Sequence, residues 1–210
     1  MAVIGRGRWL LVAALLSAAG LGGCDRGDSA TRPQFHATDI TGADFGHRLS
    51  LPDADGRTRT LEDFKGKVTL LFFGYTQCPD VCPTTLAELA RIKKELGAEG
   101  DRIQGVFVTV DPERDTPAVL KAYVSSFDPT FVALRGSPEQ TAAAAKEFKV
   151  FYARVDGKTP GSYTMDHTAA SYVIDQQGRL RLFVRYGSPL QDLAADLKAL
   201  LVDHYLVPWL

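Results

Sequence analysis

Two cysteines separated by three residues lie in the stretch FFGYTQCPDVCPTTLAEL, residues 72 to 89, where an apolar segment gives way to a helical one. Cys78 and Cys82 stand at positions i and i+4. If the first helical turn begins by Pro79, their Cβ atoms lie on one face, about 5 to 6 Å apart. That separation suits a shared metal ion, and a modest adjustment allows a disulfide. The pair is therefore a candidate for redox chemistry, metal binding or structural cross-linking.

The surroundings of the two cysteines favour the thiolate, which is both the nucleophilic and the metal-binding form. Pro79 and Pro83 each follow a cysteine, where they stiffen the loop and remove backbone donors. A purely structural disulfide across so short a loop would contribute roughly 2 kcal/mol in the chain-entropy model, and a domain of this size does not depend on it. The usual thioredoxin-type dithiol has two intervening residues rather than three, so that motif does not describe this pair.

A histidine can complete a metal site with the two thiols. Of the four histidines, His36 and His47 lie in a polar N-terminal segment, and His204 lies near the end of the last expected helix. His167 differs because it lies in Thr164–Thr168, a polar loop expected immediately before a buried strand. A loop histidine alone is more often a solvated or capping residue, but two thiols on a facing element favour a ligand.

The donor types indicate which metal such a site would hold. Two thiolates and one imidazole form a soft, three-coordinate set that suits Cu(I), and an added oxygen ligand would complete a Cu(II) site. Structural zinc usually takes four Cys or His ligands, which this set does not supply. Asp166 can provide an oxygen or hold His167 in the required tautomer, and it can equally cap the loop.

The hydrophobic pattern predicts the elements that position these side chains. Val68–Phe73 is apolar on both faces, as in a central strand covered on both sides. A helix with a buried stripe is expected over Pro83–Leu96. A hairpin is expected around Asp55-Gly56. Further strands are expected at Ile103–Val110, Phe131–Leu134, Val150–Val155, Ala169–Ile174 and Leu180–Tyr186, and a further helix from Pro117.

Two later segments share one helix-start signal. Ser137–Gln140 and Ser188–Gln191 each place Ser at the N-cap, Pro at the first helical position and Gln two positions further on. The helices are expected to end near Phe148 and Tyr205. Strands alternating with helices, ending in a hairpin and a C-terminal helix, predict an α/β fold: a thioredoxin-like three-layer sandwich with a mixed central sheet flanked by helices. In this plan the loop that carries His167 faces the N-terminus of the helix after Cys78.

The composition is that of an ordinary globular domain. The chain has 210 residues, of which 45% are hydrophobic and 23% charged, so it can bury a sizeable core. The formal net charge of −1 comes from 24 Lys and Arg against 25 Asp and Glu. Because no basic field arises from this balance, nucleic acid is not an expected partner.

The N-terminus has the pattern of an export signal. Arg6 and Arg8 precede an apolar run, Trp9–Leu21, which is shorter than the roughly 20 residues of a membrane-spanning helix. The run ends in Leu-Gly-Gly-Cys, which resembles a bacterial lipobox with Cys24 as the lipidated residue; an ordinary signal sequence with an incidental cysteine is the alternative. We therefore expect a signal peptide over residues 1–23, a lipidated flexible tether over 24–48 and a thioredoxin-like copper-binding domain over 49–210.

Three motifs together resemble those of a known family. Gly74–Pro83 reads GYTQCPDVCP, Val110–Pro117 reads VDPERDTP, and Asp166–Thr168 reads DHT. In this order they resemble the signatures of the Sco/SenC proteins, which are copper-binding, thioredoxin-like proteins needed for assembling cytochrome c oxidase. Much of VDPERDTP can be explained by residues that end a strand (Asp111-Pro112) and start a helix (Thr116-Pro117). Arg114 lies among acidic residues in this segment and is expected to hold the loop by ion pairs.

The resemblance implies a site and a location. Cys78, Cys82 and His167 would bind copper at the periplasmic face of the bacterial inner membrane. Family members are implicated in supplying the dinuclear copper centre of cytochrome c oxidase subunit II, or in keeping its cysteines reduced. This chain departs from members with a transmembrane helix, because its anchor resembles a lipid on Cys24. Asp25 resembles an inner-membrane retention signal.

Two functions of different classes follow from the same residues. The first is a copper chaperone that binds one copper and passes it to the oxidase subunit, with other periplasmic copper carriers or thiol reductants as further partners. The second is a thiol-disulfide oxidoreductase in which Cys78 and Cys82 form the redox-active pair and reduce the cysteines of the oxidase copper site. Peroxide or redox sensing by the same pair is a third interpretation.

Overall fold

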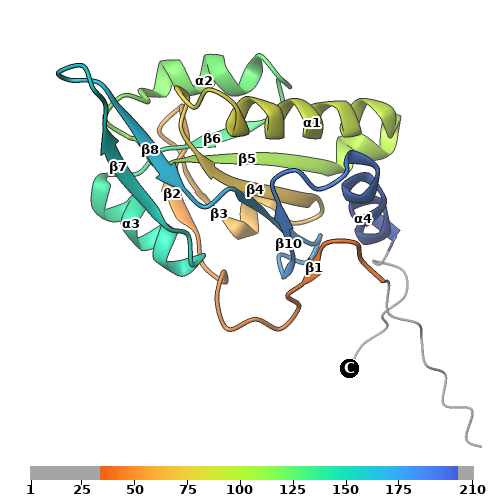
Figure 1. Ribbon diagram of the computed structural model, residues 1–210. Coiled ribbons are helices and arrows are strands. Elements are labelled where there is room, and N and C mark those ends of the chain that lie inside the picture. The colour runs from red at the N-terminus through yellow and green to blue at the C-terminus, as the bar shows by residue number, and fades with distance from the viewer. Residues whose placement is uncertain (1–33, 203–210) are drawn as a thin grey trace, which may run out of the picture. The chain divides into compact units, whose positions relative to one another are not determined.

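A six-stranded mixed sheet forms the middle layer of the protein (Figure 1). The computed structural model describes residues 34–202. The sheet order is β1-β10-β9-β4-β5-β6, with β4, β5 and β6 parallel to one another and the remaining neighbours antiparallel. The strands are β1 (Thr38–Asp39), β2 (Ser50–Pro52), β3 (Thr58–Thr60), β4 (Val68–Gly74), β5 (Ile103–Thr109), β6 (Val132–Leu134), β7 (Tyr152–Asp156), β8 (Tyr163–His167), β9 (Ala170–Ile174) and β10 (Leu180–Arg185). The helices are α1 (Val81–Glu95), α2 (Pro117–Ser125), α3 (Pro138–Glu147) and α4 (Leu190–Val202), with 3₁₀ turns η1 (Leu61–Phe64) and η2 (Gly97–Arg102).

The sheet centre is the continuous apolar strand that the sequence predicts. Every residue of β4 and of β5 is buried, and the two strands run in parallel register from Val68 opposite Ile103 to Gly74 opposite Thr109. Because successive side chains point to opposite faces, Phe72 and Phe73 reach different layers. Phe72 packs with Phe107, whose ring also contacts Tyr123 of α2.

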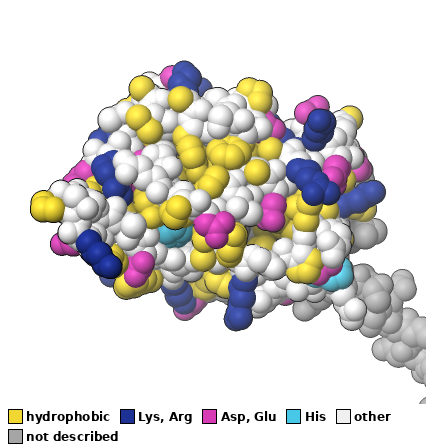
Figure 2. Space-filling view, turned by 45° about the horizontal axis from the view of Figure 1, so that its top comes forward, with side chains coloured by type: hydrophobic (Ala, Val, Ile, Leu, Met, Phe, Trp, Pro, Cys, Tyr) yellow, Lys and Arg dark blue, Asp and Glu magenta, His cyan; other side chains and the backbone are white. Residues whose placement is uncertain are grey.

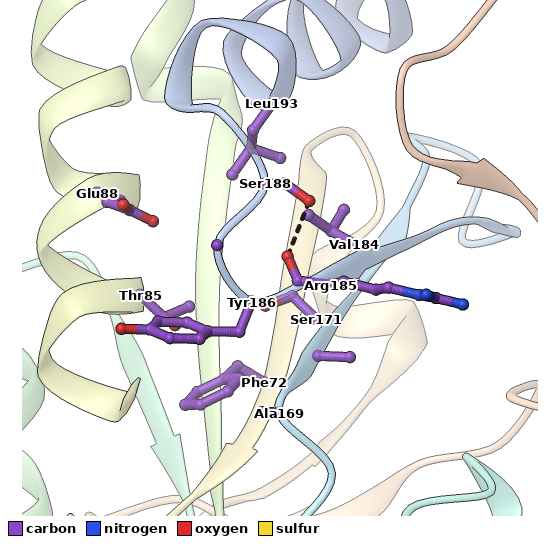
Figure 3. Close-up of a pocket in the computed structure, with 12 residues that line it drawn as sticks. Phe72, Thr85, Glu88, Ala169, Ser171, Val184, Arg185, Tyr186, Ser188 and Leu193 are labelled. Atoms are coloured by element: carbon purple, nitrogen blue, oxygen red, sulfur yellow. Dashed lines mark hydrogen bonds between the residues drawn. The ribbon is translucent and has the colours of Figure 1, made fainter. Parts of the chain in front are cut away.

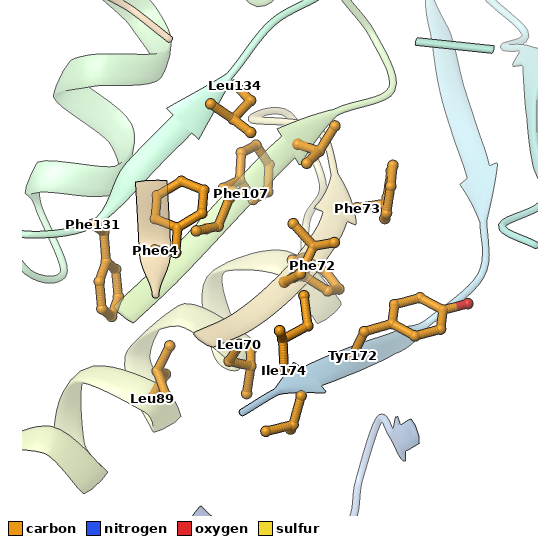
Figure 4. Close-up of a cluster of buried hydrophobic side chains, with 14 of the residues drawn as sticks. Phe64, Leu70, Phe72, Phe73, Leu89, Phe107, Phe131, Leu134, Tyr172 and Ile174 are labelled. Carbon is orange, nitrogen blue, oxygen red and sulfur yellow. The ribbon is translucent and has the colours of Figure 1, made fainter. Parts of the chain in front are cut away.

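The opposite face is covered by the α3 segment. The Phe73 ring lies 5.7 Å from that of Phe148, which directly follows α3. Figure 4 shows Phe72, Phe73 and Phe107 among the buried side chains around β4 and β5. The predicted three-layer, thioredoxin-like sandwich with a mixed sheet is therefore confirmed (Figure 1).

The two helix-start signals have different outcomes. At α3, the Ser137 hydroxyl accepts a hydrogen bond from the Gln140 N–H, and the Gln140 side-chain oxygen accepts one from the Ser137 N–H, so the predicted capping box is present. At α4, Ser188 instead donates its hydroxyl to the Arg185 carbonyl, and the helix begins only at Leu190. The predicted Ser188 cap is wrong because the first helical hydrogen bond runs from the Leu193 N–H to the Pro189 carbonyl, so Ser188 lies one residue before the cap position. The predicted end near Tyr205 lies outside the described residues.

The segment before His167 is a strand rather than the predicted loop. Residues Tyr163–His167 form β8, which pairs antiparallel with β7 in a separate two-stranded sheet. Its alternate residues Thr164 and Asp166 are exposed, so one face of the hairpin is polar. That polarity is why the composition of TMDHT indicated a loop.

Part of the expected tether is packed against the domain. β1 pairs with β10, and the backbone N–H groups of His36 and Ala37 donate to the buried Asp196 of α4. The Phe45 ring meets the Tyr172 ring edge-on. The packed domain therefore begins before residue 49. The expected signal peptide over 1–23 and Cys24 lie outside the described residues. Within residues 34–202, no helix has the length and apolar character needed to cross a membrane.

Candidate metal centre

The structure brings the three predicted ligands together at the end of β4. The Sγ atoms of Cys78 and Cys82 and a ring nitrogen of His167 all lie within 4.8 Å of one another. Cys82 Sγ lies 3.6 Å from His167 Nε2. Two elements far apart in the sequence meet here, since the cysteines adjoin the start of α1 and the histidine ends β8.

The cysteines reach this arrangement through a turn rather than through helical spacing alone. α1 begins at Val81 with Asp80 as N-cap, so Cys78 precedes the helix. A turn in which the Cys78 N–H donates to the Tyr75 carbonyl folds the chain back, and the Cys82 N–H then faces Cys78 Sγ at 3.5 Å. Both cysteines are free thiols. The expected helical turn from Pro79 is thus not present, yet the sulfurs still meet.

The two thiols differ in exposure. Cys78 is half-buried, whereas Cys82 is fully buried in the core. Burial raises the pKa of the Cys82 thiol far above its ordinary value; a hydrogen bond from the Tyr75 backbone acts in the opposite direction. Cys82 therefore holds its proton until a cation replaces it, and metal binding here would release that proton. Cys78 is the thiol that a partner molecule can reach.

The His167 ring is set in one tautomer by the backbone. Nδ1 lies 3.2 Å from the Thr168 carbonyl oxygen, which only accepts hydrogen bonds. Nδ1 consequently carries the proton, and Nε2 directs its lone pair toward Cys82 Sγ. Burial lowers the pKa of His167, while the hydrogen bond to Thr168 and the charge of Asp166 act to raise it. A neutral imidazole with a free Nε2 is the metal-binding form.

Asp166 is placed differently from the prediction. Adjacent residues of a strand point to opposite faces, and the Asp166 side chain is exposed while His167 is half-buried. The Thr168 carbonyl, rather than Asp166, is the hydrogen-bond partner of Nδ1. His36 and His47 lie elsewhere on the domain, where their backbones bond to Asp196 and Glu147. His204 lies outside the described residues.

Aromatic side chains that the sequence did not single out form the walls of the centre. The rings of Phe72 and Tyr75 each stand edge-on to the His167 ring, with centroids 6.0 Å away. Gly74 forms the floor, because a Cβ atom there would lie 2.7 Å from Cys82 Sγ. Phe72, Gly74 and Tyr75 directly precede the cysteines in the sequence. An apolar strand that ends in glycine just before paired cysteines could have indicated that these residues line the site.

A buried carboxylate anchors the loop that leads to Cys78. Asp115 is fully buried and accepts hydrogen bonds from the Thr76 N–H, the Thr76 hydroxyl and the Thr109 hydroxyl. Burial raises the pKa of Asp115, and these hydrogen bonds oppose the rise. This anchoring role was not predicted from the sequence, because Asp115 directly precedes the helix-starting Thr116-Pro117 and was interpreted as part of that helix-start signal.

A small cavity shares Phe72 with the centre. It is lined by Thr85 and Glu88 of α1 and by Tyr186 and Ser188 from the turn after β10, and Figure 3 shows the Tyr186 ring extending toward Thr85. Its volume of about 20 Å³ is room for roughly one water molecule. On the face shown in Figure 2, Lys and Arg side chains alternate with Asp and Glu among hydrophobic ones, so neither charge dominates there.

The fold and the centre define a class: thioredoxin-like domains in which two thiols and one imidazole converge as a soft metal-binding or thiol-active site. The chain belongs to the SCO1/SenC family, whose family model matches residues 37–202. This finding confirms the resemblance that the three motifs indicated.

Relatives and solved structures agree with this assignment. An SCO2-like protein of Rickettsia felis is 41% identical over 147 residues, which cover 69% of this chain and 72% of the relative. The structure of Bradyrhizobium japonicum ScoI with copper bound is 43% identical, with a TM-score of 0.67, covering 74% of this chain and 99% of that one. Apo Sco1 from Thermus thermophilus is 41% identical, with a TM-score of 0.70, covering 80% and 97%.

Proposed function

We propose that this protein binds one copper ion through Cys78 Sγ, Cys82 Sγ and His167 Nε2, and acts as a copper chaperone in the assembly of cytochrome c oxidase. The observation that carries the proposal is the convergence of these three ligand atoms within 4.8 Å. Soft thiolates and an imidazole suit Cu(I). The copper-bound ScoI structure, which shares 43% of its residues with this chain, supports the same choice of metal.

The uneven exposure of the ligands suits delivery rather than permanent storage. Cys82 is fully buried, while Cys78 is half-buried and can be approached from solvent. An acceptor thiol can therefore enter beside Cys78 and exchange for it. The acceptor that we propose is the dinuclear copper centre of oxidase subunit II, and a periplasmic copper carrier would supply the cargo.

Copper stoichiometry of the reduced protein tests the ligand set. We expect one Cu(I) per wild-type molecule and at least a tenfold weaker affinity in His167→Ala, since loss of one of three ligands removes far more than a neighbouring contact does. His47→Ala is the matched control, because His47 is exposed and lies elsewhere on the domain. Equal copper affinity in wild type and His167→Ala would refute the ligand role.

A second candidate function is supported by the asymmetry of the free thiols. Cys78 is accessible and receives a hydrogen bond from the Cys82 N–H, whereas Cys82 is buried directly behind it. In a thiol-disulfide exchange, the Cys78 thiolate would attack a partner disulfide, forming a mixed disulfide and releasing one partner thiolate. Cys82, on losing its proton, would then attack Cys78 Sγ. The second partner thiolate would leave, and a Cys78–Cys82 disulfide would remain.

Trapping distinguishes the two functions. A Cys82→Ser variant cannot resolve a mixed disulfide, so a reductase would accumulate a covalent complex with oxidase subunit II in copper-free membranes. A chaperone that acts only by ligand exchange would give no such complex in this variant, while the wild-type protein would still transfer copper. Cys78→Ser serves as the control, since it removes the accessible sulfur.

The location that we propose is the periplasmic face of the inner membrane, through a lipid on Cys24. The lipobox-like sequence Leu-Gly-Gly-Cys and the following Asp25 support this proposal. Cys24→Ala should release the protein from membranes and abolish incorporation of labelled palmitate. Fractionation that finds the wild-type protein in the outer membrane would refute the retention role of Asp25.

A further inference from the structure

Arg114 lies where three segments of the chain meet. It belongs to the loop between β5 and α2, and its Nε donates to the buried Asp111 of the same loop. Its Nη1 donates to the Gln77 side-chain oxygen at 3.1 Å and to the Tyr163 carbonyl at 2.8 Å. The guanidinium plane also stacks on the Tyr163 ring, with 3.5 Å between Cζ and the ring centroid.

These contacts join the two halves of the metal centre. Gln77 directly precedes Cys78, and Tyr163 begins the strand that ends at His167. Arg114 also lies 5.7 Å from the ring of Tyr75, which stands against the imidazole. A single side chain thus connects the cysteine loop, the histidine strand and one wall of the site.

The histidine strand needs such a connection. Among residues 34–202, β8 pairs only with β7, so no backbone ladder fixes it to the six-stranded sheet whose strand β4 leads to the cysteines. A cavity of about 170 Å³ is lined by Met165 of the hairpin together with Pro112 and Pro138. Met165 packs against the core, but the cavity leaves this side of β8 incompletely packed, so specific side-chain contacts add to its support.

Arginine is the residue type that can make all these contacts at once. Its planar guanidinium presents several donors in a fixed fork and a flat face for stacking, whereas the ammonium of lysine is a point charge. We propose that Arg114 is a positioning residue of the metal centre, which holds the His167 strand at bonding distance from the two thiols. This inference rests on the proposed copper site.

A matched pair of arginines makes the proposal testable. Arg154 stacks on the same Tyr163 ring, at 3.9 Å, but it is exposed and pairs with Asp156 without touching the cysteine loop. Arg114→Lys should weaken Cu(I) affinity about tenfold, in the range typical of residues that orient metal ligands. Arg154→Lys should change it less than about twofold. Gln77→Ala removes one arm of the bridge without disturbing buried Asp111, and it should weaken affinity by an intermediate factor.

The route of the effect is tested in a second background. If Arg114 acts by positioning His167, then Arg114→Lys should have less than about a twofold effect on Cu(I) affinity in a His167→Ala protein. An undiminished tenfold loss there, or an equal loss in Arg154→Lys, would overturn the proposal, because the side chain would then act on the thiols or on the fold as a whole.

A metal-free measurement separates this proposal from the proposed function. Nuclear Overhauser contacts between the Tyr75 and His167 rings, whose centroids lie 6.0 Å apart, report the closure of the hairpin without copper. They should weaken in Arg114→Lys and persist in Arg154→Lys. If the wild-type protein bound no copper, the proposed chaperone function would be refuted. The ring contacts would still test whether Arg114 positions His167. Unchanged ring contacts in Arg114→Lys would refute it.

Discussion

The two halves of the metal centre are built in different ways. The cysteines follow β4, whose seven residues are all buried and which has a hydrogen-bonded neighbour on each side. His167 ends β8, a strand of an outlying hairpin with exposed residues on one face. The thiols are therefore fixed by the core, and the imidazole is fixed by side-chain contacts. Because of this difference, fold stability and ligand geometry should respond to separate sets of substitutions.

The largest expected effect is in the cysteine half. Phe72→Ala removes a ring that is 1% exposed and packs against Phe107, and it should lower the free energy of unfolding by about 3 to 5 kcal/mol. Val155→Ala, on the exposed edge of the hairpin, should cost less than about 0.5 kcal/mol. Urea denaturation followed by circular dichroism measures both. Similar losses for the two variants would mean that the hairpin belongs to the cooperative core.

The same difference explains how much could be predicted from the sequence. The strand at Val68–Phe73 and the helix after Cys82 were found because burial imposes a clear hydrophobic pattern on them. The strand that carries His167 was predicted as a loop, since an outlying hairpin alternates polar residues with half-buried ones. The three residues proposed as ligands were nevertheless singled out, and the structure brings them together, because thiols and imidazoles are few and their chemistry limits the combinations.

Other parts of the site depend on contacts that no local pattern contains. Thr76 reaches Asp115 across 39 positions of sequence, and Arg114 reaches Tyr163 across 49. The Thr168 carbonyl took the orienting role expected of Asp166, because the strand turns that aspartate outward. The outward direction of the Asp166 side chain and the use of the Thr168 carbonyl as the partner of His167 Nδ1 could not be predicted without knowing that residues 163–167 form a strand.

The next largest effect compares two glycines of the central sheet. A Cβ atom at Gly74 would lie 2.7 Å from Cys82 Sγ, and one at Gly105 would lie 2.6 Å from the Phe131 ring. Each alanine substitution should cost about 1 to 3 kcal/mol through overpacking. Only Gly74→Ala should also weaken Cu(I) binding, since it displaces a proposed ligand. Chelator competition measures the copper affinity, and thermal unfolding measures the stability. Equal copper affinity in both variants would contradict the claim that close packing against Gly74 fixes the position of Cys82 Sγ.

A smaller effect is expected where the cysteine loop is tied to the core. Thr76→Val keeps the shape of the side chain but removes the hydroxyl that donates to Asp115. We expect a loss of about 1 to 2 kcal/mol, because the buried Asp115 loses one of its hydrogen-bond donors. Thr84→Val removes a longer, exposed hydrogen bond to Asp80 and is the control. Denaturant midpoints should rank Thr76→Val clearly below Thr84→Val. The reverse order would show that Asp115 does not hold the loop.

The smallest effect concerns the pH dependence of the histidine half. Burial lowers the pKa of His167 below its ordinary value of 6.5. On acidification the unfolded chain therefore takes up a proton at this residue before the folded protein does. The free energy of unfolding should fall as the pH drops through 6.5, and this contribution should level off below the folded pKa. The midpoint of the His167 ring titration, followed by NMR in the metal-free protein, measures the shift directly.

The same titration tests whether the two halves close on each other. The Phe72 and Tyr75 rings that surround the imidazole belong to the cysteine half, so part of its desolvation comes from across the interface. Tyr75→Ala should bring the His167 pKa back toward 6.5 by admitting water, while Tyr152→Ala, within the hairpin, should change it less. An unchanged pKa in Tyr75→Ala would place the cause of the shift inside the hairpin. The imidazole would then be buried by its own strand and not by the half of the molecule that carries the thiols.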